Sequence, residues 1–229
     1  MKKVVNFQDF ISEGRSAYDG IASRLVKAAF RTWIQEWKSG AKSAEYSEQV
    51  EEPGLEFDLT ATLHMNKKVK GFEVLNSTGA DGRDIDDDDE DMTPFINIDF
   101  AVNPEWLPGY FQEIYMHLSD VMRHEMEHIT QDGEGVGNYR AGKPIEDDQY
   151  MRTMIDQGFL PKVTYLMLPK EVDANLQGLR YEAKKRKESM EFTVNKYLDT
   201  QDYLSSEERE EVLTLWRKRA KQIGGIPNF

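Results

Sequence analysis

From Leu55 to Asn66 the chain alternates strictly between apolar and polar side chains. The apolar positions are Leu55, Phe57, Leu59, Ala61, Leu63 and Met65. Because successive side chains of a β-strand point to opposite faces, this pattern predicts a strand with one buried face and one solvated face. A helix would spread these apolar side chains around its whole circumference, so we expect the fold to contain a sheet.

Other segments predict further strands beside this one. Val69–Leu75 follows a turn at Asn66–Lys68, which favours a hairpin with the first strand. Phe95–Val102 alternates in the same way. Residues 41–54 are polar and end in Pro53-Gly54, which indicates a loop. The short connections favour a small antiparallel or mixed sheet of three to four strands.

Segments whose apolar residues recur at helical spacing precede and follow the predicted strands. Residues 1–40 carry an apolar stripe at three- and four-residue steps, and the same period returns over Tyr110–Gln131. We expect another helix to begin at Pro169, because proline suits the first helical position. The run Ser205–Glu208 is a capping box, which predicts that a last helix begins there. Asp132–Asp148, rich in Gly and Asp, is expected to be a loop.

The order of these elements predicts an α+β fold in which helices precede and follow the strands along the chain. A length of 229 residues favours a single domain. Within it we distinguish an N-terminal helical segment (1–40), a central part with the sheet and the site helices (55–185) and a C-terminal helical extension (186–229).

Composition excludes several classes of protein. The chain has 29 basic and 42 acidic residues, a net charge of −13, which argues against non-specific nucleic-acid binding. No apolar run approaches the roughly 18 residues of a membrane-spanning helix, and Met1–Asp9 lacks the apolar core of a secretory signal. There is no cysteine, so disulfides, thiolate metal sites and cysteine nucleophiles are excluded. We therefore expect a cytoplasmic protein without membrane or nucleic-acid partners.

The negative charge is concentrated in Asp81–Asp91, which holds eight acids and one arginine, a net charge of −7. Several carboxylates in a row could bind Ca²⁺. The run departs from the EF-hand order, however, because it lacks the required Gly and Glu positions. A solvated, self-repelling loop is the better interpretation.

The segment His124-Glu125-Met126-Glu127-His128 has the pattern H-E-x-x-H within the helix expected at Tyr110–Gln131. Residues four apart lie about 40° apart around a helix and roughly 6 Å along it. Two such imidazoles can converge on one metal ion with bonds of about 2.0–2.1 Å. Glu125 could then reach a water on zinc, whose pKa falls to roughly 7. The alternative is a pair of surface histidines on a polar helix face.

This pattern resembles the zincin superfamily of zinc metallopeptidases. The resemblance implies one Zn²⁺ per chain on His124 and His128, with Glu125 as general base. In zincins an edge strand precedes the metal-binding helix and holds the peptide substrate in an extended form. Phe95–Val102 is the matching strand in this sequence.

A third protein ligand is needed, and Glu171, in the first turn of the helix expected at Pro169, is the best candidate. A glutamate supplied by a second helix resembles the gluzincin arrangement. The run from Glu171 to Asn175 is also similar to the E-x-E-A-N segment of gluzincin-like peptidases that cleave repressors. Glu134 stays open as an alternative ligand, although the metzincin pattern would require histidine there. Glu171 could instead only stabilise the helix N-terminus.

Supporting roles remain to be assigned. Asp173 or Asn175 could orient a ligand imidazole, which zinc histidines usually require. Peptide hydrolysis builds negative charge on the carbonyl oxygen, and Tyr165, Arg180 and Tyr181 are candidates to stabilise it.

The two remaining histidines are expected to play no direct part in metal binding. His117 lies about 10.5 Å from His124 along the helix axis, which is too far to share an ion, so we interpret it as a packing or supporting residue. His64 falls on the polar face of the first strand and is expected to be solvated.

The leading hypothesis is a zinc-dependent peptidase that hydrolyses a protein or peptide substrate, either broadly or as a regulatory protease with one partner. The alternative is a catalytically silent zincin-shaped binding or structural protein. The acidic, cysteine-free chain and its opening Asn6–Ile11 resemble phage-encoded proteins, which implies the host cytoplasm and, for the silent alternative, a virion-associated role.

Overall fold

The computed structural model describes residues 7–52, 55–80, 94–131, 145–223, 226–227 and 229, and the first element is a long helix, α1 (Phe7–Ser39). It lies within the predicted N-terminal helical segment. Trp33 is fully buried, and its indole Nε1 donates a hydrogen bond to the carbonyl oxygen of Ala61 at 3.1 Å. This bond and the surrounding apolar contacts hold α1 against the sheet.

Four strands form a mixed sheet in the order β1-β2-β4-β3. The strands are β1 (Ser43–Glu52), β2 (Leu55–Met65), β3 (Phe72–Ala80) and β4 (Phe95–Val102). β1 pairs antiparallel with β2, β2 pairs parallel with β4, and β4 pairs antiparallel with β3. The predicted α+β class with a small mixed sheet is thus confirmed.

The structure corrects three predictions about the sheet. Residues 43–52 form strand β1 rather than a loop, because an edge strand needs only a few inward apolar residues, here Ala44 and Val50. The strand after the turn at Asn66–Lys68 pairs with β4 and not with β2, so the predicted hairpin is wrong. β4 is therefore an interior strand, and β3 is the edge strand instead.

The remaining helices follow the sheet in sequence. They are α2 (Leu107–Gln131), α3 (Ile145–Asp156), the 3₁₀ helix η1 (Lys162–Met167), α4 (Pro169–Arg186), α5 (Met190–Asp199) and α6 (Ser206–Ile223). The helices expected at Tyr110–Gln131 and from Pro169 are confirmed. The capping box is also present, because the Ser205 hydroxyl accepts a hydrogen bond from the Glu208 amide and the Glu208 carboxylate accepts one from the Ser205 amide.

The loop predicted at Asp132–Asp148 ends earlier than expected, because α3 begins at Ile145. Residues 132–144 lie outside the described residues. None of the helices described here is both long and apolar enough to cross a bilayer.

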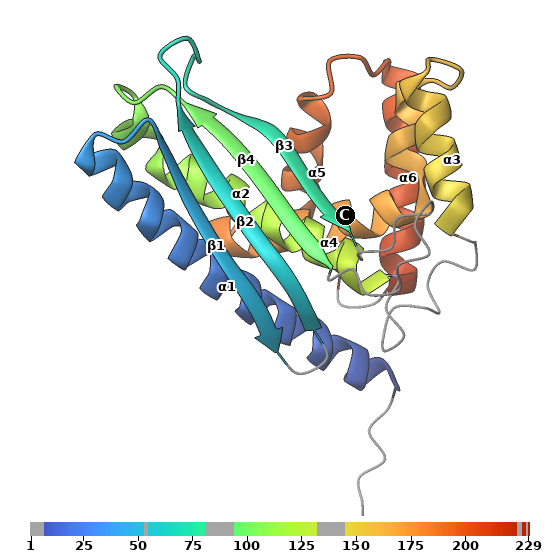
Figure 1. Ribbon diagram of the computed structural model, residues 1–229. Helices are drawn as coiled ribbons and strands as arrows, with labels where there is room; N and C mark the ends of the chain where they lie inside the picture. The colour runs from blue at the N-terminus through green and yellow to red at the C-terminus, as the bar shows by residue number, and fades with distance from the viewer. Residues whose placement is uncertain (1–6, 53–54, 81–93, 132–144, 224–225, 228) are drawn as a thin grey trace, which may run out of the picture.

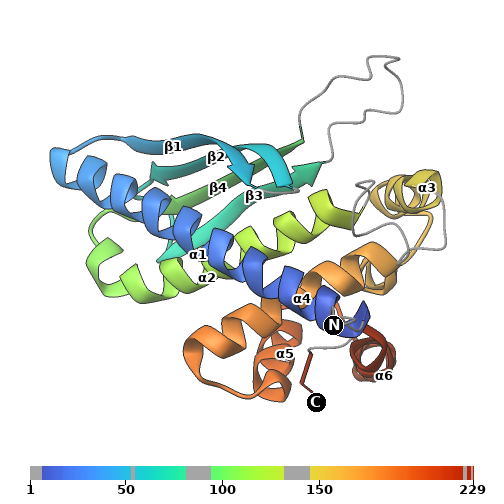
Figure 2. The same cartoon turned by 90° about the horizontal axis from the view of Figure 1, so that it is seen from below.

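The chain builds two hydrophobic clusters, one on each side of α2. Helices α1 and α2 cover one face of the sheet, whereas α4, α5 and α6 lie farther from it than α2 does (Figures 1 and 2). The first cluster joins α1, the sheet and α2, and the second joins η1, α4, α5 and α6. Helix α4 contacts both α2 and the C-terminal helices, so its side chains are buried on most sides.

Candidate metal centre

Helix α2 carries both histidines of the H-E-x-x-H pattern on the face that meets α4. Their Nε2 atoms lie 3.1 Å apart, and the two rings meet edge to face. The helix begins after Asn103, whose side-chain oxygen accepts the backbone N–H of Glu105 at 3.1 Å. Within this helix, the spacing of four residues brings the two imidazoles together, as the sequence predicts.

Helix α4 supplies Glu171 from its first turn. Pro169 occupies the first helical position, where its missing N–H costs nothing. The Glu171 side chain is fully buried. Its Oε1 lies 3.3 Å from Nε2 of His128, and its Oε2 lies 3.6 Å from Nε2 of His124. The structure thus brings the three predicted ligands into one cluster.

The donor set fits a zinc ion. Bonds of about 2.0–2.1 Å at tetrahedral angles place two ligand atoms about 3.3 Å apart, close to the separations observed here. Ligand atoms of His124, His128 and Glu171 all lie within 4.8 Å of one another, and these three residues are the one such cluster in the part of the chain that the structure describes. Oε2 of Glu171 is buried without a hydrogen-bond partner. A cation would satisfy this otherwise unpaired oxygen.

The electrostatics of the cluster also suit metal binding, which requires an ionised carboxylate and neutral imidazoles. Burial alone raises the pKa of Glu171, but the hydrogen bond from His128 and the charges of His128, His124 and Arg152 hold this pKa at about 2. Burial lowers the pKa of His124. Burial also lowers the pKa of His128, yet the contact with Glu171 outweighs it and raises the pKa. The low pKa of Glu171 and the lowered pKa of His124 thus suit metal binding, and a bound cation would replace the proton that Glu171 favours on His128.

The cluster lies in a cleft of about 480 Å³ between β3, α2, α4 and α5. Glu125 lines this cleft beside the ligands and is only 3% exposed. The cleft lining also includes Tyr165, Asn175 and, from the edge strand, Ser77. Two of the candidate ligands, His124 and Glu171, thus line one cleft together with Glu125 and Tyr165.

Arg152 of α3 is a residue of the site that the sequence interpretation missed. Its Nη2 hydrogen-bonds to Oε1 of Glu171, and its guanidinium lies over the ring of Tyr165 at 5.5 Å from the ring centroid. The missed signal is the start of α3, where Pro144 precedes three acidic residues, and Met151, Met154 and Ile155 then follow at helical spacing.

The proposed supporting residues divide into two groups. Tyr165 lies in the cleft, where burial and then the nearby charge of Glu171 raise the pKa of its hydroxyl. Asn175 also lines the cleft, and its Nδ2 is buried without a hydrogen-bond partner. Asp173 instead binds Arg219 of α6 through both oxygens, at 2.6 and 2.7 Å, and does not line the cleft.

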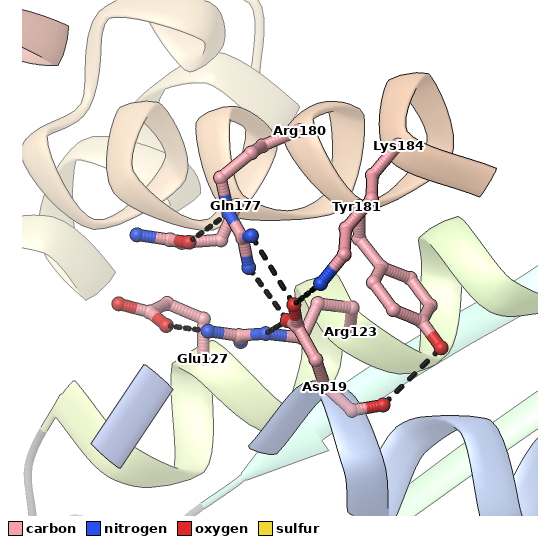
Figure 3. A network of polar contacts seen from close by, with 7 residues as sticks. All are labelled: Asp19, Arg123, Glu127, Gln177, Arg180, Tyr181 and Lys184. Carbon is pink, nitrogen blue, oxygen red and sulfur yellow. Dashed lines mark hydrogen bonds and ion pairs between the residues drawn. The ribbon is translucent and has the colours of Figure 1, made fainter. Parts of the chain in front are cut away.

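Arg180 and Tyr181 belong to a separate polar network centred on Asp19 of α1 (Figure 3). Arg180 donates to both oxygens of Asp19, at 2.5 and 3.2 Å, and the Tyr181 hydroxyl donates to its backbone oxygen at 3.2 Å. Arg123 lies 3.5 Å from Asp19 and donates to Glu127 at 2.9 Å. Since Arg123 and Glu127 each precede a candidate metal ligand, this network ties α1 and α4 to the part of α2 that carries His124 and His128, and its residues do not line the cleft.

The other predicted features lie elsewhere. His117 lines the cleft away from the ligands and contacts the ring of Phe72 at 5.2 Å between centroids, in keeping with a packing role. His64 is half-exposed and lies 3.5 Å from Asp99. Glu134 and the Asp81–Asp91 run fall outside the described residues, so the alternative third ligand and the calcium interpretation stay sequence predictions.

Comparison of the chain with protein-family models, with curated protein sequences and with solved structures finds no match. The functional argument therefore depends on the residues and their geometry.

Proposed function

We propose that this protein is a zinc-dependent peptidase of the zincin type. The ligands are His124, His128 and Glu171, and Glu125 is the general base. One observation carries the proposal: the imidazole Nε2 atoms of His124 and His128 and the carboxylate of Glu171, from two separate helices, lie 3.1–3.6 Å from one another, and Oε2 of this buried carboxylate has no hydrogen-bond partner. This is the arrangement that tetrahedral zinc with two imidazoles and one carboxylate requires.

Zinc bound by these ligands would polarise a carbonyl group and lower the pKa of a coordinated water to about 7. Glu125 would take a proton from water at this site and pass it to the leaving nitrogen, because Glu125 lines the same cleft as His124 and Glu171. Tyr165 donates a hydrogen bond to the negative charge that develops on the carbonyl oxygen. In this arrangement the three ligands would hold the ion, Glu125 would transfer the proton and Tyr165 would stabilise the developing negative charge.

The edge strand β3 supplies a surface for an extended substrate. Pairing with β4 is irregular between Val74 and Asn76, and this bulge places Val74 opposite Phe100 and Ser77 opposite Ile98. Val74 and Ser77 therefore share the cleft side of the strand although they are three residues apart. A peptide could add to the outer edge of β3 through main-chain hydrogen bonds.

Metal analysis of the purified protein, combined with two sets of variants, tests the proposal. We expect about one zinc per chain, lost in His124→Ala and His128→Ala. Glu125→Gln should keep the zinc and abolish hydrolysis of a mixed peptide pool. Glu105→Gln is a matched control, because it makes the same change at an exposed position that pairs with Lys67.

The outcome separates the two functional classes. Zinc retention without any peptide hydrolysis by the unmodified protein would favour the catalytically silent binding protein. Hydrolysis that survives Glu125→Gln would contradict the proposed mechanism. Protein that binds no zinc when His124 and His128 are intact would contradict both readings.

A further inference from the structure

Away from the candidate metal ligands, the same cleft is lined by further residues of α2, α4 and α5. The acidic side chains among them are Asp120, one turn before His124 on α2, and Glu182 on α4, and Thr193 of α5 adds a hydroxyl group. We call this part of the cleft the acidic arm. One helical turn separates it from the ligands, a distance of about 6 Å along α2.

Asp120 lies directly against α4, at a point where only glycine leaves room. A Cβ atom added to Gly178 would lie 2.5 Å from Oδ1 of Asp120 and 3.1 Å from its backbone oxygen. Burial, together with the nearby charge of Glu182, raises the pKa of Asp120 well above its usual value. The carboxylate of Asp120 is therefore placed where ionisation is unfavourable unless a cation approaches.

The basic side chains around the arm do not supply that cation. Arg186 donates to Glu182 at 2.6 Å and to Glu113 at 2.8 and 3.2 Å, so its guanidinium is already bound by two other carboxylates. Lys196 is exposed at the rim, and its charge acts on Glu113 and His117. The charge of Arg186 lowers the pKa of Asp120 but does not outweigh burial, and among the described residues no basic side chain forms an ion pair with Asp120.

A further residue of the cleft lining points independently to a ligand in this cleft. Asn175 lies one turn after Glu171 on α4, lines the cleft and is only 5% exposed. Its Nδ2 donor has no hydrogen-bond partner. A buried donor left unpaired costs about 1–3 kcal/mol, and a substrate carbonyl oxygen would satisfy it.

We propose that the acidic arm is a specificity subsite that binds the lysine or arginine side chain of a residue next to the scissile peptide bond. This inference rests on the proposed peptidase function. The long aliphatic stem of such a side chain spans the turn between the ligands and Asp120, and Val121 and Tyr197 line the cleft along it. The cationic head then pairs with Asp120, beside the Glu182 carboxylate that Arg186 already binds, and this offsets the cost of burying Asp120.

The test is a set of peptides that differ only at the residues flanking one central bond. These residues are lysine, arginine, glutamine, norleucine or glutamate, and cleavage by the zinc-loaded protein is followed by mass spectrometry. We expect lysine and arginine peptides to be cleaved at least tenfold faster than norleucine and glutamine peptides. Asp120→Asn and Glu182→Gln should each reduce this preference while norleucine cleavage persists. Glu105→Gln should leave the preference unchanged.

Binding of fluorescent lysine and norleucine peptides to the zinc-loaded Glu125→Gln variant gives a second readout that does not depend on turnover. Equal cleavage of all peptides, or equal binding of these two, would overturn the subsite and leave the peptidase proposal intact. Absence of cleavage of every peptide by the unmodified protein would instead overturn the peptidase proposal and the subsite with it.

Discussion

Arg152 hydrogen-bonds to the same oxygen of Glu171 that lies 3.3 Å from Nε2 of His128. A guanidinium and a candidate metal-binding imidazole thus share one carboxylate oxygen. A metal ion held by Oε2 alone would leave Arg152 on Oε1, whereas an ion that also bound Oε1 would compete with Arg152 for that oxygen. Its side chain is 38% exposed, which leaves it room to move towards the cleft.

Replacing Arg152 by glutamine should strengthen zinc binding and weaken catalysis. Removal of a positive charge close to a divalent cation favours the bound ion, and we expect a zinc dissociation constant about tenfold lower. The rate of hydrolysis should fall, because the guanidinium that lies over the ring of Tyr165 and binds Glu171 is lost, and both of these residues line the cleft. Competition with a chelator and steady-state kinetics measure the two effects. Weaker zinc binding would show that Arg152 supports the ligand rather than competing with the metal.

Replacing Gly178 by alanine should separate α2 from α4. The new Cβ would lie 2.5 Å from Oδ1 of Asp120 and 3.4 Å from Cβ of His124. We expect a loss of about 1–3 kcal/mol of unfolding free energy and weaker zinc retention, because the two helices carry different ligands.

Gly20→Ala is the matched control for this change. Gly20 lies in α1 with nothing within 4 Å of an added Cβ. Alanine there should raise the unfolding free energy by about 0.5–1 kcal/mol and leave zinc retention unchanged. Chemical denaturation and zinc analysis of both variants check the pair. An equally small effect of both changes would mean that α2 and α4 are not in the close contact described.

Asp19 should make the protein sensitive to acid. Burial alone raises its pKa, but hydrogen bonds from Arg180 and Lys184 and the charges of Arg180 and Arg123 outweigh burial and hold the pKa below its usual value. A carboxylate with a lowered pKa stabilises the folded state above its unfolded pKa of about 3.8, and this contribution is lost as the pH falls through the folded pKa.

The Asp19→Asn variant isolates this contribution. It should be less stable than the unmodified protein near neutral pH by about 3 kcal/mol, because it leaves buried cations unpaired. The difference between the two proteins should shrink as the pH falls from about 5 to about 2. Urea denaturation across this range measures it, and a constant difference would contradict the assignment.

Tyr165 and Tyr181 should respond differently to replacement by phenylalanine. Tyr165 lines the cleft, so Tyr165→Phe should slow hydrolysis about tenfold to a hundredfold with zinc content unchanged. The Tyr181 hydroxyl donates to the backbone of Asp19 instead, so Tyr181→Phe should cost about 1 kcal/mol of stability and leave hydrolysis unchanged. Comparable loss of hydrolysis in both variants would refute the role given to Tyr165.

Several elements were predictable from local sequence because their signals are local. The strict alternation at β2, the capping box at Ser205 and the proline at the start of α4 each depend on a few neighbouring residues. The meeting of His124 and His128 belongs to the same group, since helix geometry alone brings residues four apart together.

The errors share the opposite cause. β1 is polar along most of its length and is a strand because it pairs with β2, so its own side chains, of which only Ala44 and Val50 are buried, carry too weak an alternation to predict it. The insertion of β4 between β2 and β3 likewise depends on which edges of the sheet pair best. Arg152 was missed because its helix follows a Gly- and Asp-rich segment that was extended too far.

The sequence by itself determined that the chain is α+β and that one helix carries two histidines and a glutamate with a metal-binding spacing, because backbone periodicity decides such features within a few residues. Only the tertiary structure decided that Glu171 is buried between those histidines, that Arg152 shares its carboxylate and that β3 forms the edge beside the cleft. These relationships join residues far apart in the chain, and they depend on how α2 and α4 pack together, which no local pattern encodes.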